Sequence, residues 1–152
     1  MIEFLLSFII SLIILTYLIN EFERQNEINE EIYEVDQMRG KQFEEYLLIL
    51  FEQNGYKVEL TPRSQGYGAD LILYKDGLIF AVQAKRYKKP VGVKAVEEVL
   101  GSMKYHKAKK AIVITNSIFT MNADRLARSK SVILWDRRKL IKLIRRSKMK
   151  AS

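Results

Sequence analysis

The apolar N-terminal segment constrains this chain most, because it has to be separated from whatever globular domain follows. Phe4 to Ile19 contains no charged side chain, and Glu3 is the only charged side chain before it. A transmembrane helix needs about 20 such residues, with a range of roughly 17–25. A cleaved signal peptide is disfavoured, because no basic region precedes the segment and no small-residue cleavage motif follows it. A buried core helix is disfavoured because every face is apolar. We therefore expect residues 1–19 to form a transmembrane helix, with residues 2–19 in the membrane.

Charge is divided unevenly along the chain. Residues 1–37 hold eight acidic and one basic side chain and sum to −7, whereas residues 38–152 sum to +15, for a net charge of +8. The basic part is expected in the cytoplasm, which makes the chain a single-pass protein of the cell membrane. A basic domain points to a polyanionic partner, either nucleic acid or an anionic membrane surface. A solvated basic surface is the alternative, and charge alone does not separate these readings.

Residues 20–37 form an acidic connector between the apolar segment and the domain. Ile28, Ile32 and Val35 recur at the spacing of one helix face, which is typical of a short helix. Such a helix could pair with a second copy of the chain, or the segment could be a solvated stalk. Because the apolar positions are so few, we favour the solvated stalk.

The composition excludes several kinds of chemistry. The chain has 152 residues, enough for one domain, since domains run on the order of 100–150 residues. It has no cysteine and one histidine, His106. Disulfides, cysteine-based zinc sites, thiol catalysis and sites with several histidines are therefore excluded. Any catalysis has to use carboxylates, amides, hydroxyls, lysine or arginine.

Helical and strand patterns alternate beyond the connector. The apolar run Ala111 to Ile114 is typical of a strand covered on both faces, and Asp76-Gly77 between two apolar runs indicates a hairpin. The expected elements are helix 40–54, strands 56–60, 70–75 and 78–85, helix 93–107, strand 111–114, helix 120–130, strand 132–135 and helix 138–145. We expect helix 93–107 to place on one side Val93, Val96, Leu100 and Met103. This order predicts a layered α/β domain.

The hairpin places polar side chains on one face of the sheet. With a two-residue turn at Asp76-Gly77, opposed residues have numbers that sum to 153, so Asp70 lies opposite Gln83. Lys85 follows two residues later and shares that face. A slip of one residue would destroy the arrangement, so the register is the assumption to test. On spacing alone, an Asp–Lys pair at the sheet end, with Gln83 capping a loop, remains an alternative to a functional site.

Glu44 is a fourth candidate, because it lies beside the expected buried face of helix 40–54 and needs a partner or a metal there. Carboxylate and amide oxygens suit Mg²⁺, which keeps several waters and takes other ligands from phosphate. Beside such an ion, Lys85 could hold or deprotonate the attacking water and neutralise charge on phosphorus.

These residues carry a resemblance to a known family. The chain resembles the catalytic domain of Mrr-type restriction endonucleases, of the PD-(D/E)xK nuclease superfamily, over about residues 38–145. The matching pieces are Gly40 to Glu44, Asn54 to Tyr56, Gly68 to Leu71, Val82 to Tyr87, Val91-Gly92, Thr115-Asn116, Phe119-Thr120 and Ala123. The resemblance implies a restriction-endonuclease-like three-layer fold, with a central mixed β-sheet flanked by helices. It assigns residues 38–146 to a nuclease domain and leaves 147–152 as a basic tail.

The resemblance also implies roles for the site residues. Asp70, Gln83, the backbone carbonyl of Ala84 and Glu44 would hold Mg²⁺, with Mn²⁺ as a substitute, and Lys85 would be the catalytic lysine. Gln83 stands where most of the superfamily has an acid, so the site has one negative charge fewer. A membrane helix stands where related restriction enzymes often have a DNA-recognition domain.

Basic residues around the site are candidates for DNA binding, because cations can grip phosphates and position the backbone. The candidates are Arg63, Arg86, Lys88, Lys89 and Lys94, together with Ser64. The basic C-terminal run from Arg137 to Lys150 could instead track DNA or meet anionic lipid.

Two functions remain from the sequence. The first is a membrane-tethered, Mg²⁺-dependent DNA endonuclease that hydrolyses phosphodiester bonds, in restriction of foreign or modified DNA. The second is a non-catalytic DNA-binding membrane anchor that keeps the nuclease fold. A double-strand cutter needs two active sites, so we expect a homodimer.

Overall fold

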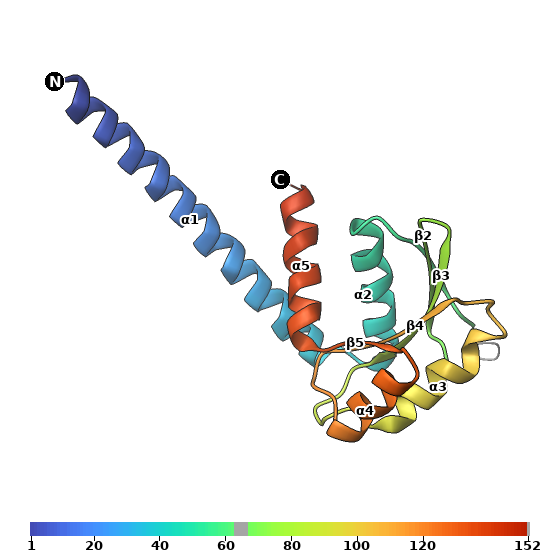
Figure 1. Cartoon of the computed structure of the whole chain (residues 1–152). Coiled ribbons are helices and arrows are strands. Elements are labelled where there is room, and N and C mark those ends of the chain that lie inside the picture. Colours follow the sequence, from blue (N-terminus) through green and yellow to red (C-terminus); the bar gives the residue numbers. More distant parts are fainter. Residues whose placement is uncertain (63–66, 152) are drawn as a thin grey trace.

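The computed structural model describes residues 1–62 and 67–151. These residues form one five-stranded sheet in the order β1-β2-β3-β4-β5, in which β1 to β3 are antiparallel and β3 to β5 are parallel. The strands are β1 (Lys57–Leu60), β2 (Leu71–Lys75), β3 (Leu78–Lys85), β4 (Lys110–Thr115) and β5 (Ile133–Trp135). The helices are α1 (Ile2–Gln37), α2 (Gly40–Gln53), α3 (Val93–Met103), α4 (Met121–Ser129) and α5 (Arg137–Ala151). The predicted fold class, a mixed sheet flanked by helices, is confirmed (Figure 1).

The hairpin between β2 and β3 has the predicted register. Lys75 pairs with Leu78 and Leu71 pairs with Val82, so opposed numbers sum to 153 throughout. The turn residues Asp76 and Gly77 both have positive φ angles, 52° and 75°. This is the conformation of a two-residue type I′ turn, whose twist matches that of the flanking strands.

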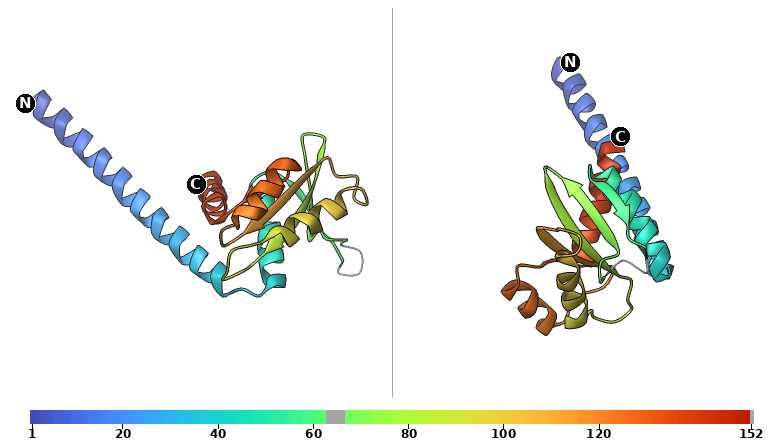
Figure 2. Two further views of the ribbon diagram at one scale, coloured as in Figure 1. Left: turned by 60° about the horizontal axis from the view of Figure 1, so that its bottom comes forward. Right: turned by 90° about the vertical axis from the view of Figure 1, so that its right-hand side faces the viewer.

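Helices cover both faces of the sheet (Figures 1 and 2). One face packs against α2, α5 and the last turns of α1, in a core that includes Phe43, Phe51, Leu140 and Ile144. The other face packs against α3 and α4 in a second cluster. The continuous apolar run of β4 is explained by its place between β3 and β5, with a core on each side.

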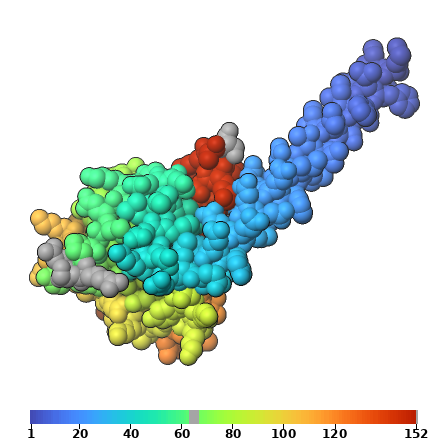
Figure 3. All heavy atoms as spheres, turned by 180° about the vertical axis from the view of Figure 1, so that it is seen from behind, coloured from blue at the N-terminus to red at the C-terminus, as the bar shows by residue number. Residues whose placement is uncertain are grey.

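The acidic connector is not a solvated stalk, and that expectation is wrong. Residues 2–37 form one continuous helix of 36 residues, about 54 Å long at 1.5 Å per residue. Ile28, Ile32 and Val35 are buried in the core that α2 and α5 share. The first half of α1 stands clear of the domain (Figure 3), and it is long and apolar enough to cross a membrane by length and composition.

Part of the basic C-terminal run makes contacts inside the protein. It forms α5, which extends to Ala151 and includes most of the predicted basic tail. Arg137 pairs with Asp36 at 2.7 Å, and Lys148 pairs with Glu31 at 2.8 Å. One side of α5 therefore neutralises acidic residues of α1, because the two helices lie side by side (Figure 1).

Candidate functional site

The four residues predicted as catalytic lie together. Glu44, Asp70, Gln83 and Lys85 line one open pocket of about 420 Å³ at the end of the sheet where β3 ends. Gln83 and Lys85 lie on β3, and Asp70 comes directly before β2. The regular pairing ends at Leu71 and Val82, and the Asp70 N–H also donates to the Val82 carbonyl at 2.7 Å, one residue out of the ladder register. The hairpin register is what brings Asp70 to the β3 side chains.

The Asp70 carboxylate is held by the backbone of the facing strand. Its Oδ2 atom accepts a hydrogen bond from the Ala84 N–H at 2.8 Å. Burial raises the pKa of Asp70 above its ordinary value, and the charge of Glu98 acts in the same direction. The Ala84 hydrogen bond and the charge of Lys85 oppose this rise in the pKa.

Glu98 is a member of the site that the sequence analysis missed. Its Oε2 atom lies 2.7 Å from Lys85 Nζ, and both side chains are largely buried. Of the residues predicted to share one side of α3, Val96 is buried, Leu100 and Met103 pack partly buried against the same core, and Val93 is exposed. The fully buried residues of the helix also include Ala95, Val99 and Ser102. The centre of the buried face therefore lies closer to Ala95 and Val99 than predicted, and Glu98 lies at the pocket. The signal available in the sequence was the small-residue spacing of Ala95, Val99 and Ser102.

A glycine allows α3 to approach the pocket this closely. A Cβ atom on Gly68 would lie 2.1 Å from the carbonyl oxygen of Glu98, and Gly68 has a φ angle of +94°. Both the space and the backbone conformation therefore favour glycine. The segment that leads into Asp70 packs directly against the helix that supplies Glu98.

The donor atoms fit a hard divalent cation. Glu44 and Asp70 offer carboxylates and Gln83 offers an amide oxygen, and Mg²⁺ accepts such ligands while keeping several waters. Among the described residues that line the pocket, the carboxylates of Glu44, Asp70 and Glu98 outnumber the ammonium group of Lys85, which favours a cation there. Among the described residues, no three His, Cys, Asp or Glu side chains form a metal cluster by themselves. The role of the Ala84 carbonyl stays a prediction.

The structure describes only some of the predicted DNA-binding residues. Arg63 and Ser64 lie outside the described residues. Lys88, Lys89 and Lys94 are exposed on the segment from the end of β3 to the start of α3. Arg86 turns the other way, and its Nη1 atom donates to the backbone carbonyl of Asp36 at 3.2 Å. The structure thus gives Arg86 a contact with α1.

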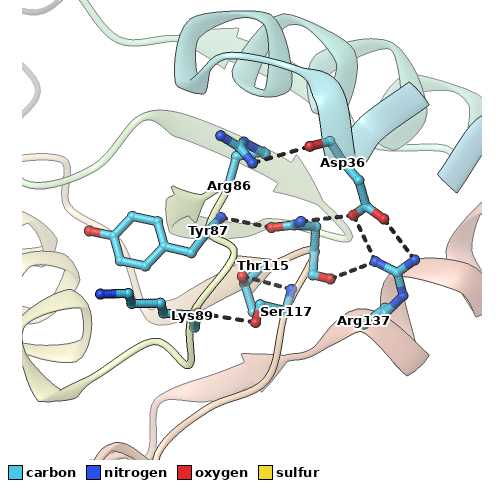
Figure 4. A network of polar contacts seen from close by, with 8 residues as sticks. Asp36, Arg86, Tyr87, Lys89, Thr115, Ser117 and Arg137 are labelled. Carbon is cyan, nitrogen blue, oxygen red and sulfur yellow. Dashed lines mark hydrogen bonds and ion pairs between the residues drawn. The ribbon is translucent and has the colours of Figure 1, made fainter. Parts of the chain in front are cut away.

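Asp36 is the centre of a network beside the site (Figure 4). Its two carboxylate oxygens accept hydrogen bonds from Arg137 at 2.7 and 2.9 Å, and Oδ1 also accepts one from Asn116 Nδ2 at 2.9 Å. Asn116 Oδ1 in turn accepts the N–H of Tyr87, two residues after Lys85. Burial raises the pKa of Asp36, but the hydrogen bonds from Arg137 and Asn116 outweigh it and hold the pKa below its ordinary value. The network connects the end of α1 to the segment that follows Lys85.

Solved structures share this fold. AspBHI, described as a DNA modification-dependent restriction endonuclease, has a TM-score of 0.62 and 22% identity, over 82% of this chain and 36% of that one. MspJI restriction endonuclease in complex with a 27-mer oligonucleotide has a TM-score of 0.57 and 17% identity, over 81% and 31%. The protein of unknown function AF1548 has a TM-score of 0.53 and 20% identity, over 61% and 55%. The chain thus spans about a third of the two restriction enzymes and about half of AF1548.

Sequence comparison supplies the family. No curated protein matches the chain significantly. The Mrr_cat family, described as restriction endonuclease, matches residues 35–144, which include all four predicted catalytic residues and Glu98. The match begins at the end of α1 and ends within α5, so it covers the sheet and its helices. The chain therefore belongs to the Mrr_cat family of restriction endonucleases.

Proposed function

We propose that this chain is a membrane-tethered, metal-dependent DNA endonuclease that hydrolyses phosphodiester bonds, in restriction of foreign or modified DNA. The observation that carries the proposal is the convergence of Glu44, Asp70, Gln83 and Lys85 in one pocket. DNA as substrate is supported by the fold shared with MspJI, which is described in complex with an oligonucleotide. Modified DNA is suggested by the description of AspBHI, although the chain spans only 36% of that enzyme.

Each residue of the pocket has a distinct task in this proposal. Asp70, Gln83 and Glu44 supply oxygen ligands for a divalent ion, which would be Mg²⁺ or Mn²⁺. When bound, the ion would stabilise the negative charge that develops on the phosphate and lower the pKa of a bound water. Lys85 donates hydrogen bonds to the attacking water or to a phosphate oxygen. Glu98 holds the Lys85 ammonium in the pocket before DNA arrives.

The membrane part of the proposal rests on α1. Its apolar half spans the bilayer, and the nuclease domain lies in the cytoplasm. The apolar half extends on the side of the domain where the β2–β3 turn and the C-terminus lie, whereas the pocket is at the other end of the sheet, where β3 ends (Figure 1). The pocket therefore lies at the end of the sheet away from the apolar half of α1, which leaves room for DNA.

Plasmid cleavage tests the enzyme directly. The full chain in detergent should cut supercoiled plasmid with Mg²⁺ or Mn²⁺ and lose this activity in EDTA. Lys85→Ala and Asp70→Ala should each lower the rate by at least about 100-fold, since they remove a charge that acts in the transition state. Lys110→Ala, an exposed lysine on β4, is the matched control. Plasmid that is bound but left intact under every metal would instead support a non-catalytic DNA-binding membrane anchor.

Membrane fractionation tests the tether. The full chain should stay in the membrane pellet after alkaline carbonate extraction, and a chain of residues 20–152 should move to the supernatant. Recovery of the full chain in the supernatant would refute the transmembrane assignment of α1 and leave the nuclease proposal untouched.

A further inference from the structure

The last helix, α5, has two chemically different sides. Arg137, Arg145 and Lys148 face α1 and pair with its acidic residues. A second side is exposed to solvent and carries the cations Lys139, Lys142, Arg146 and Lys150. The helix contains no acidic residue. We call these four the α5 cationic face. In the part of the chain that the structure describes, none of them forms an ion pair.

The end of α5 is held next to the apolar half of α1. Arg145 Nη1 lies 2.5 Å from the carboxylate of Glu21, and its Nη2 hydrogen-bonds to Gln25. Glu21 comes only two residues after Ile19, where the apolar stretch ends. From Arg145 the helix continues for six residues to Ala151, about 9 Å at 1.5 Å per residue. The C-terminus and the N-terminus lie on the same side of the domain (Figure 1).

This position determines which partner the cations meet. If α1 spans the membrane, Glu21 lies at the boundary between the apolar layer and water. Arg146 and Lys150 then lie near the headgroups, within the range over which an anionic surface attracts cations. Met149, which is 60% exposed at the tip of α5, can enter the boundary between headgroups and acyl chains. The catalytic pocket, by contrast, is at the other end of the sheet.

We propose that the α5 cationic face binds the anionic headgroups of the bilayer in which α1 is inserted. The proposal rests on the membrane insertion of α1 that is part of the proposed function. It gives the domain a second attachment, beside α1, which holds the domain against the membrane with the pocket turned to the cytoplasm. The main competing partner is DNA, because Tyr56 and Trp135 line a hollow of about 320 Å³ with three of the same cations.

A single fluorescent label distinguishes these partners. The chain has no cysteine, so Met149→Cys in the full chain can carry one environment-sensitive fluorophore. The labelled chain is reconstituted in nanodiscs of phosphatidylcholine, with or without 30 mol% phosphatidylglycerol, as probe. We expect the anionic lipid to shift the emission to shorter wavelength and to lower quenching by aqueous iodide severalfold. High salt should reverse both changes, because the attraction is electrostatic.

Two triple variants with equal charge loss make the test specific. The first is Lys142→Gln, Arg146→Gln and Lys150→Gln on the α5 cationic face, which should abolish the lipid response and leave the affinity for DNA unchanged. The matched control removes three exposed cations from the segment between the end of β3 and the start of α3, Lys88→Gln, Lys89→Gln and Lys94→Gln. The control should keep the lipid response and weaken DNA binding, which is measured by fluorescence anisotropy of a labelled duplex.

The possible results separate failure of the proposal from failure of its basis. A chain that inserts in neutral nanodiscs but whose label ignores phosphatidylglycerol would overturn the lipid surface alone. Loss of DNA affinity in the first triple variant, with an unchanged label, would assign the α5 cationic face to DNA. A chain that does not insert at all would overturn both this proposal and the membrane part of the proposed function.

Discussion

Side chains in the pocket are held in place by charged neighbours. Lys85 lies between Asp70 and Glu98, and its ion pair with Glu98 is largely shielded from water. A buried charge that loses its partner is costly, and removing one member of such a pair leaves the other uncompensated. Glu98 therefore orients the Lys85 ammonium group, whereas Asp70 and Gln83 are the ligands proposed for the metal. In this proposal Glu98 is a positioning residue.

Glu98→Gln should lower the plasmid cleavage rate about 10-fold to 100-fold, as is typical when a residue that orients a metal-site group is changed. The amide keeps the size of the side chain but no longer neutralises Lys85. Glu97→Gln, an exposed acid one position earlier on α3, is the matched control and should cut at the wild-type rate. Equal rates in both variants would show that Lys85 does not need Glu98.

Gly68→Ala should destabilise the fold by more than about 2 kcal/mol, because it adds a steric clash to an unfavourable backbone conformation. The new Cβ atom would lie 2.1 Å from the Glu98 carbonyl oxygen. Gly77→Ala is the control, since Gly77 also has a positive φ angle but nothing within 4 Å. Urea unfolding of both variants separates the two effects. The contact with α3 would be unimportant if both variants lost the same free energy of unfolding.

At the scale of elements, the end of α1 is tied to two distant parts of the chain. Asp36 binds Arg137 at the start of α5, and through its carbonyl and through Asn116 it reaches Arg86 and Tyr87, just after β3. The end of the helix proposed to enter the membrane thus contacts the segment that follows Lys85, directly through Arg86 and through Asn116 (Figure 4).

Asp36→Asn should cost about 1 kcal/mol of unfolding free energy at pH 7, since the ion pair is partly exposed and surface pairs contribute about this much. The pKa of Asp36 is lowered from 3.8 in the folded state. Its contribution is therefore complete above pH 3.8 and is lost as the pH falls through the lower folded pKa. Urea unfolding of wild type and variant from pH 7 to pH 3 measures this.

The difference between wild type and Asp36→Asn should stay constant down to about pH 5 and shrink below pH 4. Asp124→Asn removes a more exposed ion pair, with Arg128, and serves as control with little effect at any pH. A difference that grew as the pH fell would contradict the role given to the Asp36–Arg137 pair.

At the scale of the whole molecule, an acidic helix end meets a basic helix. Residues 1–37 have a net charge of −7 and the remaining residues one of +15. Part of each charge is neutralised by ion pairs between α1 and α5. The last turns of α1 also complete the core, since Ile28 and Val35 are fully buried. The nuclease fold therefore begins inside α1, before the position at which the family match starts.

A chain of residues 38–152 should be far less stable than one of residues 20–152. It lacks three buried aliphatic side chains, each contributing about 1.5–3 kcal/mol, and it lacks Asp36. That loss is comparable to the whole stability of an ordinary domain, about 5–15 kcal/mol. Circular dichroism during thermal unfolding compares the two chains. Equal midpoints would mean that α1 adds nothing to the core.

Much of the site could be predicted because it depends on local geometry. Strand periodicity and the Asp76-Gly77 turn predicted that Asp70, Gln83 and Lys85 lie together, and the structure brings them into one pocket. Glu98 could not be found in this way, because its place depends on how α3 is rotated against the sheet. The burial of Ile28, Ile32 and Val35 depends likewise on a partner helix, α5, that lies more than 100 residues later in the chain.

The sequence by itself determined the order of the elements, the hairpin register and the shared face of three site residues, because each follows from periodicities of two or 3.6 residues and a short turn. Only the tertiary structure decided that Glu98 pairs with Lys85 and that α1 completes the core. It also decided that cations of α5 pair with acidic residues of α1. Those outcomes depend on packing between segments far apart in the chain, such as Asp36 and Arg137, 101 positions apart. A local sequence pattern does not determine which amphipathic helix faces pack against each other.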